Sequence, residues 1–319
     1  MSQVHASARP ARWKTLLAFA TIYLVWGSTY LAIRIGVGEV PPFLLAALRF
    51  LIAGGLLYGW LVLRGERSPR FREWVAVFLL AVCIFVLDYG LLFWAEQRVP
   101  SGIAAVMLAT IPAFMTLSEI IFLKTQRLTL HLAVALLIGL AGVAVLMSHS
   151  IVLGGTPVDR AGAMALMISA VSWSIAAALN RMLPLPESKA MSSGSQMLAG
   201  GILLGIASLA LGEFRGFHFG AVSRSAWLAL GYLIVFGSII AFTAYVWLLH
   251  HESPTKVGTY AYVNPVIAVL LGYFFAGEPL GLRTILGAAF VLASVVMITT
   301  AQAKKSAIAP VAAKEEGVA

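Results

Sequence analysis

Ten apolar stretches, each close to 20 residues long, recur along the chain and limit what it can fold into. A helix that spans the hydrocarbon core of a bilayer needs about 20 mostly apolar residues. The stretches occupy residues 14–35, 43–63, 73–94, 101–123, 130–148, 161–180, 192–212, 226–248, 256–276 and 282–301. Charged residues make up only 11% of the chain, whereas a soluble domain carries about 25%. We therefore predict an all-α integral membrane protein with ten transmembrane helices.

The two halves of the chain resemble each other. Val99–Phe114 and Ser253–Leu271 both open with an X-Pro step and run through small apolar residues to a second proline, Pro112 or Pro265. Duplicated hydrophobic halves are typical of transporters, whose substrate site lies where the repeats meet. We divide the chain into an N-terminal segment 1–13, a first repeat 14–148, a second repeat 161–301 and a flexible tail 302–319.

The distribution of Lys and Arg predicts the orientation of the spans. Loops on the side of the N-terminus carry 15 of these residues, and loops on the other side carry 6. Because cytoplasmic loops are enriched in Lys and Arg, we expect both termini in the cytoplasm. Five spans per half is an odd number, so the second repeat enters the membrane from the opposite side. The prediction is two inverted five-helix repeats, an arrangement that supports alternating access.

Several motifs together resemble the EamA family of the drug/metabolite transporter (DMT) superfamily. They are Trp26-Gly27-Ser28-Thr29, Arg49-Phe50, Pro100 to Ala105, Tyr262-Val263-Asn264-Pro265-Val266 and Gly277-Glu278, and the resemblance covers about residues 14–301. It implies a bacterial inner (plasma) membrane location, a cavity between spans 1, 3, 4, 6, 8 and 9, and export or exchange of small metabolites. One departure is that Lys124-Thr125 stands after span 4 where the family pattern has Gly-Glu, so the two gates need not be equivalent.

Polar and aromatic side chains deep in the predicted spans are the candidate lining of a substrate cavity. An apolar pocket with a few polar groups suits an amphipathic or aromatic solute. A lipid-facing or packing role is an equal alternative for any single member. The candidates are Trp26, Ser28, Tyr30, Asp88, Tyr89, Thr110, Trp173, Tyr260, Tyr262 and Asn264. Of these, Trp26, Trp173, Tyr260 and Tyr262 are predicted to converge near the midplane.

Asp88 is a carboxyl group inside the third span, where a charge costs about 2.5–3.5 kcal/mol to insert. It should therefore face a cavity, bind a proton or find a partner. One hypothesis is that Asp88 couples proton movement to transport, and the alternative is a buried structural role. In the coupling hypothesis, Asp88→Asn keeps exchange and loses accumulation driven by a pH gradient.

Three further charges, Arg49, Glu119 and Glu278, are assigned structural roles. Arg49 in the second span is expected to form an ion pair, with anion binding as the alternative. Glu119 is expected to snorkel or to pair with Arg or Lys near the cytoplasmic end of the fourth span. Pro112 and Pro265 are predicted to kink their helices, because proline removes a helical hydrogen bond. The freed carbonyls either contact substrate or merely mark a bend.

Glycine pairs predict close helix packing in the membrane. They include Gly55 with Gly59, Gly201 with Gly205, and Gly139 with Gly142. Such pairs occur in many multispan proteins, so they predict packing and say little about function.

Other chemistries have little support in the sequence. There is no GxxxxGK[ST], HExxH or CxxC motif, so we expect no enzyme, cofactor or metal site. The net charge of +9 comes from scattered loop residues, so we expect no nucleic-acid partner.

The sequence predicts a secondary transporter that exports small organic metabolites, amino acids or drug-like solutes. A membrane-embedded enzyme and a passive channel or scramblase-like pathway are the alternatives. The predicted partners are the lipid bilayer and a small-molecule substrate. The oligomeric state stays open, with a monomer as one option.

Overall fold

The computed structural model describes residues 11–124, 128–147, 158–251, 257 and 260–315. Every regular element within these ranges is helical, which confirms the predicted all-α class. Seven helical stretches are long and apolar enough to cross a membrane, and three shorter apolar helices accompany them.

The first half of the chain contains seven α-helices together with two π-helical segments. Their bounds are α1 Arg12–Val37, α2 Pro42–Leu63, α3 Phe71–Ala81, η1 Val82–Gly90, α4 Leu91–Glu96, α5 Ser101–Leu108, α6 Ile111–Ser118, η2 Glu119–Leu123 and α7 Leu130–Met147.

The second half repeats this order with fewer breaks. Its elements are α8 Arg160–Met182, α9 Lys189–Ala210, the short 3₁₀ helix η4 Phe219–Ala221, α10 Arg224–Tyr232, the π-helical η5 Leu233–Ile240, α11 Ala241–His251, α13 Tyr260–Ala276 and α14 Leu282–Glu315.

The described parts of the predicted apolar stretches fall in these helices, except that α9 ends at Ala210, two residues before the expected end, and three stretches are subdivided. The third consists of α3, η1 and α4, the fourth of α5, α6 and η2, and the eighth of α10, η5 and α11. The last helix also continues past its expected end at residue 301, as far as Glu315. Its final turns are rich in alanine and lysine, which favour a helix; flexibility of the 302–319 tail remains a prediction.

Side chains that cap the first backbone N–H groups explain where several helices begin. Asp159 accepts a hydrogen bond from the Gly162 N–H at 2.6 Å at the start of α8. Ser188 and Ser223 cap α9 and α10 in the same way. Asp and Ser are favoured N-cap residues because their oxygens satisfy backbone donors that have no helical partner.

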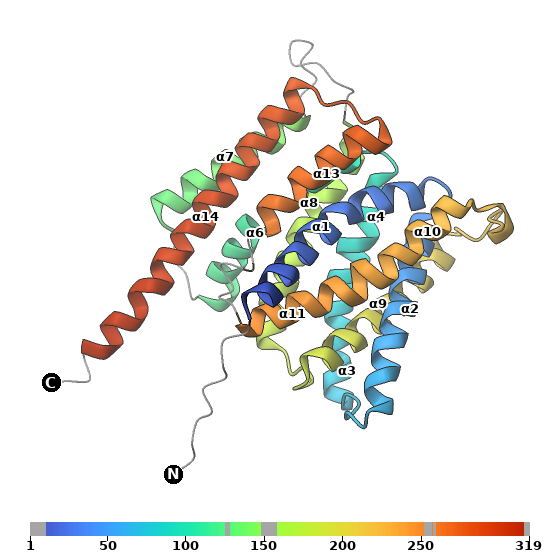
Figure 1. The fold of residues 1–319 in the computed structure, drawn as a ribbon, viewed down its shortest axis with the longest axis horizontal. Helices are drawn as coiled ribbons and strands as arrows, with labels where there is room; N and C mark the ends of the chain where they lie inside the picture. The colour runs from blue at the N-terminus through green and yellow to red at the C-terminus, as the bar shows by residue number, and fades with distance from the viewer. Residues whose placement is uncertain (1–10, 125–127, 148–157, 252–256, 258–259, 316–319) are drawn as a thin grey trace.

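The helices pack in pairs drawn from the two halves (Figure 1). The helix pair α2 and α9 makes the most extensive contact, followed by α7 and α14, which lie side by side at one edge of the bundle. In the centre, α1 packs on α13, α11 and α10, while α8 packs on η1, α4 and α6. The central helices α1 and α8 therefore each pack mainly on elements of the other half.

Apolar side chains cover much of the outer surface. Leu24, Leu56, Phe274 and Phe275 are 57–75% exposed. A soluble monomer rarely exposes large contiguous apolar patches. The surface therefore fits a lipid environment.

Only some of the glycines expected at helix contacts lie at one. A Cβ atom on Gly201 of α9 would lie 2.5 Å from the backbone nitrogen of Leu51 in α2. The positions of Gly55 and Gly59 are open, with no atom within 4 Å, so that part of the prediction is wrong. Their neighbour Gly54 is the α2 glycine that meets the backbone of α9. One position along a helix rotates a residue by about 100°, away from the contact.

Candidate functional site

Two π-helical segments, η1 and η5, lie in the middle of the third and eighth spans. A π-turn breaks the regular hydrogen-bond ladder and often marks a functional site. Side chains from other helices bind backbone carbonyls in both segments. The Ser172 hydroxyl in α8 donates to the Cys83 carbonyl of η1 at 2.9 Å. The Trp26 indole N–H in α1 donates to the Gly237 carbonyl of η5 at 3.2 Å.

Arg49 of α2 contacts both π-helical segments. Its Nε donates to the Ser238 hydroxyl of η5 at 2.9 Å. Its guanidinium carbon lies 4.7 Å from the Phe50 ring centre and 5.2 Å from the Tyr89 ring centre of η1. Contact of this kind with an aromatic face stabilises a cation. Arg49 therefore joins the two segments from one side.

The ion pair expected for Arg49 is not formed among the described residues. The side chain is only 3% exposed, and one of its terminal nitrogens, Nη1, has no hydrogen-bond partner. Aromatic rings and a hydroxyl hold the cation where a carboxylate was predicted. No carboxylate among the described residues comes within 4.0 Å of the guanidinium group, so no ion pair is formed.

The carboxyl group of Asp88 in η1 is hydrogen-bonded to a residue in the other half of the chain. Its carboxylate accepts a hydrogen bond from the Ser169 hydroxyl of α8. The side chain is 4% exposed. Asp88 thus joins η1 to α8.

The candidate aromatic residues form two groups. In the first, the Trp26 ring centre lies 5.2 Å from Tyr245 and 5.1 Å from Tyr260. In the second, Trp173 packs edge-on against Tyr89 at 6.2 Å. Of the four aromatic side chains predicted to converge, the structure brings one pair into contact, Trp26 and Tyr260.

The two aromatic groups belong to different apolar clusters. Tyr30 and Tyr89 pack against the main buried cluster, whereas Trp26, Tyr245 and Tyr260 pack against a smaller one around Ile22 and Leu248. The expected fourth member, Tyr262, has a side chain outside what the structure describes.

Two smaller candidates hold the helices together. The Ser28 hydroxyl lies 2.6 Å from the Tyr232 hydroxyl, which links α1 to α10. The Thr110 hydroxyl donates to the Met107 carbonyl at 2.7 Å, at the break between α5 and α6.

The two prolines occupy different local settings. Pro112 lies in the first turn of α6, so the fourth span breaks just before it. Pro265 lies inside α13, which continues through it. Beside it, the Asn264 amide, oriented as a donor, reaches the Tyr260 and Tyr23 carbonyls at 3.2 Å each, which links α13 to α1.

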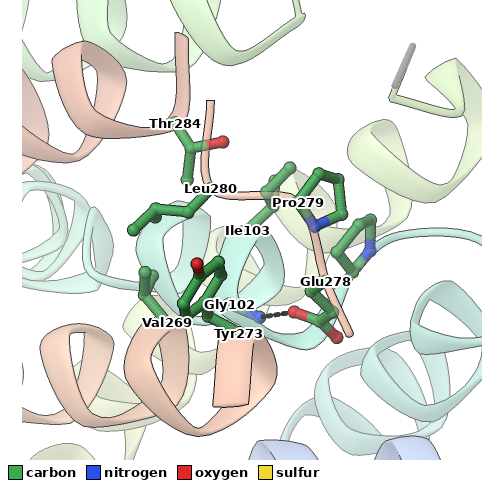
Figure 2. Close-up of a pocket in the computed structure, with 9 residues that line it drawn as sticks. Gly102, Ile103, Val269, Tyr273, Glu278, Pro279, Leu280 and Thr284 are labelled. Atoms are coloured by element: carbon green, nitrogen blue, oxygen red, sulfur yellow. Dashed lines mark hydrogen bonds between the residues drawn. The ribbon is translucent and has the colours of Figure 1, made fainter. Parts of the chain in front are cut away.

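Glu278 caps a helix of the other half of the chain (Figure 2). Its carboxylate accepts hydrogen bonds from the Ser101 N–H at 2.6 Å and the Ser101 hydroxyl at 2.7 Å. It also accepts one from the Gly102 N–H at 3.0 Å, the bond drawn in Figure 2. These are the first N–H groups of α5, where a negative charge is favoured. The structural role predicted for Glu278 therefore takes the form of a cap between the two halves.

Two more carboxylates act in the same way at the same end of the bundle. Glu213 accepts hydrogen bonds from the N–H groups of Phe43 and Leu44 at the start of α2, at 3.2 and 2.8 Å. Glu39 accepts from the N–H and the hydroxyl of Ser223, both at 2.6 Å, at the start of α10. These hydrogen bonds lower the pKa of Glu39 below its usual value. We call the end that carries Glu39, Glu213 and Glu278 the capped end.

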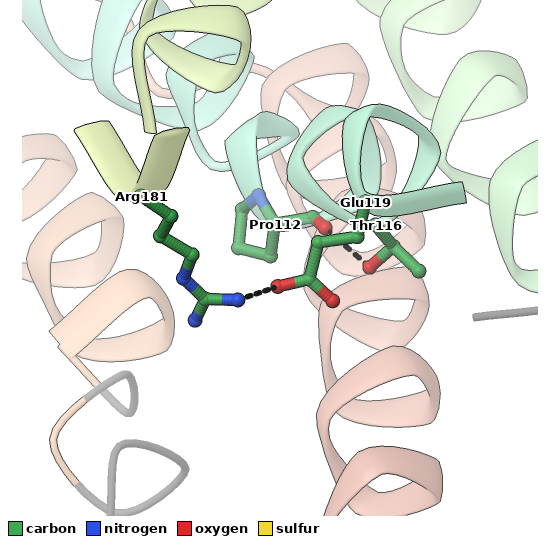
Figure 3. A network of polar contacts seen from close by, with 4 residues as sticks. All are labelled: Pro112, Thr116, Glu119 and Arg181. Carbon is green, nitrogen blue, oxygen red and sulfur yellow. Dashed lines mark hydrogen bonds and ion pairs between the residues drawn. The ribbon is translucent and has the colours of Figure 1, made fainter. Parts of the chain in front are cut away.

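The opposite end carries a weaker polar contact (Figure 3). Arg181 of α8 forms an ion pair with Glu119 at 3.2 Å, and their side chains are 62% and 20% exposed. Exposed pairs of this kind contribute about 0–1 kcal/mol. Nearby, the Thr116 hydroxyl donates to the Pro112 carbonyl at 2.8 Å.

Two hollows in the protein surface lie at the capped end. One, beside Glu278, is about 10 Å³ and has room for about one water molecule. The other is an open hollow of about 440 Å³ lined by residues such as Glu39, Gln97 and Glu213. Neither is lined by a predicted cavity residue.

Sequence reasoning missed several residues that hold the centre together. Ser169, Ser172 and Ser174 of α8 donate to Asp88, to the Cys83 carbonyl and to the Ile111 carbonyl. Their spacing on one apolar helix was a signal that could have identified them. Glu96 was also missed, since it lies two residues past the predicted end of the third span at residue 94.

Comparison with known proteins agrees with this architecture. The model of the EamA-like transporter family matches residues 13–148 and 160–300. The chain is 40% identical to the uncharacterized inner membrane transporter YedA of Escherichia coli K12, over 92% of this chain and 94% of that protein. It is 22% identical to the uncharacterized transporter YoaV of Bacillus subtilis, over 90% and 97%. A crystal structure with 26% sequence identity superposes with a TM-score of 0.59, covering 91% of this chain and 98% of the other.

Proposed function

This chain belongs to the EamA-like transporter family, and on that premise we propose that it is a secondary transporter of the bacterial inner membrane. It exports small organic metabolites, amino acids or drug-like solutes by alternating access. The observation that carries the proposal is the pair of π-helical segments at the centre, each bound by a helix of the other half.

An arrangement of ten transmembrane helices in two inverted five-helix repeats is part of this proposal. Helix pairing supports it, because exchanging the halves maps the most extensive helix contacts onto one another. The contact of α1 with η5 and α13 corresponds to that of α8 with η1 and the α5–α6 pair, while α2–α9 and α7–α14 map onto themselves. Repeats related in this way can exchange conformations, which yields inward-open and outward-open states.

We assign the capped end to the periplasm and both termini to the cytoplasm. The excess of Lys and Arg in the loops at the opposite end supports this orientation. Three cross-linking carboxylates close the capped end. On this proposal, the structure represents a state in which the solute path is closed toward the periplasm.

The solute is proposed to bind between the two aromatic groups. Trp26, Tyr30 and Tyr260 offer aromatic faces, and Asp88 and Arg49 offer opposite charges nearby. Such a mixture suits a small solute with an apolar part and a few polar groups. Of the remaining predicted members, Thr110 supplies a hydrogen-bonding group at the break between α5 and α6, and Asn264 supplies one beside Pro265 inside α13.

Counterflow in proteoliposomes tests this function. Purified protein should exchange external labelled solute for internal unlabelled solute, with saturation. The variant Trp26→Ala removes an aromatic face and the donor to Gly237, and it should reduce exchange strongly, whereas Trp13→Ala at the exposed start of α1 should not. Flux that neither saturates nor shows counterflow would indicate a channel or scramblase-like pathway. A chemically altered solute would indicate a membrane-embedded enzyme.

Fusions of a compartment-sensitive reporter test the orientation separately. A reporter after Ala319 should be active in the cytoplasm, and one inserted in the 149–159 loop should be active in the periplasm. A periplasmic C-terminus would contradict both the orientation and the even number of spans.

A further inference from the structure

Glu96, the last residue of α4, is a carboxyl group without a partner. Its side chain is 0% exposed. Neither carboxylate oxygen has a hydrogen-bond partner among the described residues. A buried carboxylate is normally paired, hydrogen-bonded or neutral, because burying an isolated negative charge is very unfavourable.

The nearest cations do not compensate for this burial. Arg34 of α1 donates to the backbone carbonyl of Glu96 and forms no ion pair with its carboxylate. Arg34 and Arg49 attract a negative charge on Glu96 electrostatically, whereas Glu278 repels it. The phenol of Tyr30 in α1 also interacts with Glu96. The carboxyl group thus lies among charges of both signs without direct contact to a cation.

Asp88, the carboxyl group first considered for coupling, is in a different situation. The Ser169 hydroxyl donates to it, so a negative charge on Asp88 has a hydrogen-bond donor. Glu96 has none. On geometry alone, Glu96 is therefore the carboxyl group whose buried negative charge a bound proton would neutralise.

Glu96 also lies where access to water can change. The next residue, Gln97, lines the open hollow at the capped end. Its amide donates to the Val37 carbonyl at the end of α1 at 3.2 Å. If α1 and α4 separate when the capped end opens, this hydrogen bond breaks and the hollow extends to Glu96. Closure then returns the carboxyl group to the dry interior.

We propose that Glu96 binds one proton from the periplasm and releases it to the cytoplasm in each transport cycle. This inference rests on the proposed transport function and names its coupling ion. The proton binds a carboxylate oxygen while the capped end is open, and closure buries the neutral acid. Release toward the cytoplasm regenerates the carboxylate, whose charge is attracted by Arg34 and Arg49. The net movement is one proton inward for each solute exported.

Transport with and without a pH gradient tests the proposal. With the membrane potential clamped, one proton per solute and a gradient of one pH unit support an accumulation ratio of about tenfold. Wild-type protein and Glu187→Gln, the same change on the exposed loop between α8 and α9, should approach this ratio. Glu96→Gln should show a ratio near one. Full accumulation by Glu96→Gln would overturn the proposal, as would an equal loss of exchange without a gradient.

Infrared spectroscopy gives a readout that does not depend on transport. Purified protein near neutral pH should show the carbonyl band of a protonated carboxyl group. The band should persist in Asp88→Asn and disappear in Glu96→Gln. If Glu96→Gln does not fold, the Asp88→Asn protein alone is decisive, and absence of the band there overturns the proposal. If the band is present but the wild type shows no counterflow, the transport function fails while the proton site stands.

Discussion

Lys124 and Gly277 hold matching positions at the ends of two helical spans, and both adopt left-handed backbone conformations. Their φ angles are 53° and 64°. Gly277 follows α13, and Lys124 follows η2 at the end of the fourth span. Glycine takes this conformation without strain, whereas a side chain makes it unfavourable. The two halves thus share a backbone turn although only the second has the residue suited to it.

Replacing Lys124 by glycine should stabilise the protein. Relief of the left-handed strain is worth about 1–2 kcal/mol, partly offset by the greater freedom of glycine in the unfolded chain. Thermal unfolding in detergent should show a higher midpoint for Lys124→Gly. The reciprocal change Gly277→Ala should lower the midpoint. A lower midpoint for Lys124→Gly would show that the lysine side chain makes a contact worth more than the strain.

Glu278→Gln should weaken closure of the capped end. The amide cannot accept all three hydrogen bonds as a charged group does, and hydrogen bonds to charged groups contribute about 1.5–3 kcal/mol each. We expect faster maleimide labelling of a cysteine placed at Val99, which is 0% exposed beside the capped start of α5, in a Cys83→Ser background. Glu187→Gln should leave the labelling rate unchanged. Equal rates in all three proteins would mean that Glu278 does not hold this end closed.

The contact between Glu39 and Ser223 should be lost in acid. Hydrogen bonds from the Ser223 hydroxyl and N–H lower the pKa of Glu39 in the folded protein. A lowered folded pKa adds stability that is present above the unfolded pKa and disappears as pH falls through the folded value. The unfolding midpoints of wild type and Glu39→Gln should therefore differ at neutral pH. They should converge below the ordinary carboxyl pKa of about 4.3, and a constant difference would contradict this assignment.

Two glycines near the α2–α9 contact should respond oppositely to alanine. Gly201→Ala would place a methyl group 2.5 Å from the Leu51 nitrogen, and overpacking of this kind costs about 1–3 kcal/mol. Gly55→Ala enters open space and gains up to about 1 kcal/mol of helix propensity. Thermal unfolding of the two variants should move to opposite sides of wild type. A neutral Gly201→Ala would show that the helices can separate slightly at no cost.

The helical segments were predictable because the bilayer imposes a length and a composition that are visible residue by residue. Arg160–Met182, for example, was predicted as 161–180. The duplication could be inferred in the same way from Pro112 and Pro265, since proline is excluded from most helix positions. The π-helical segments could not be predicted. A shift from the regular hydrogen-bond ladder depends on donors from other helices, such as Trp26 and Ser172.

The sequence by itself determined that this chain is an all-helical membrane protein of the EamA-like family, because hydropathy and local motifs act over neighbouring residues. Only the tertiary structure decided which polar groups meet. Arg49 binds Ser238, 189 positions away, and Trp173 packs on Tyr89 instead of joining Trp26. Glu278 caps α5 from 177 positions away, and the Glu96 carboxyl group has no hydrogen-bond partner among the described residues. Such pairings depend on how the helices are rotated and packed, and that is set by the sum of contacts across the whole bundle.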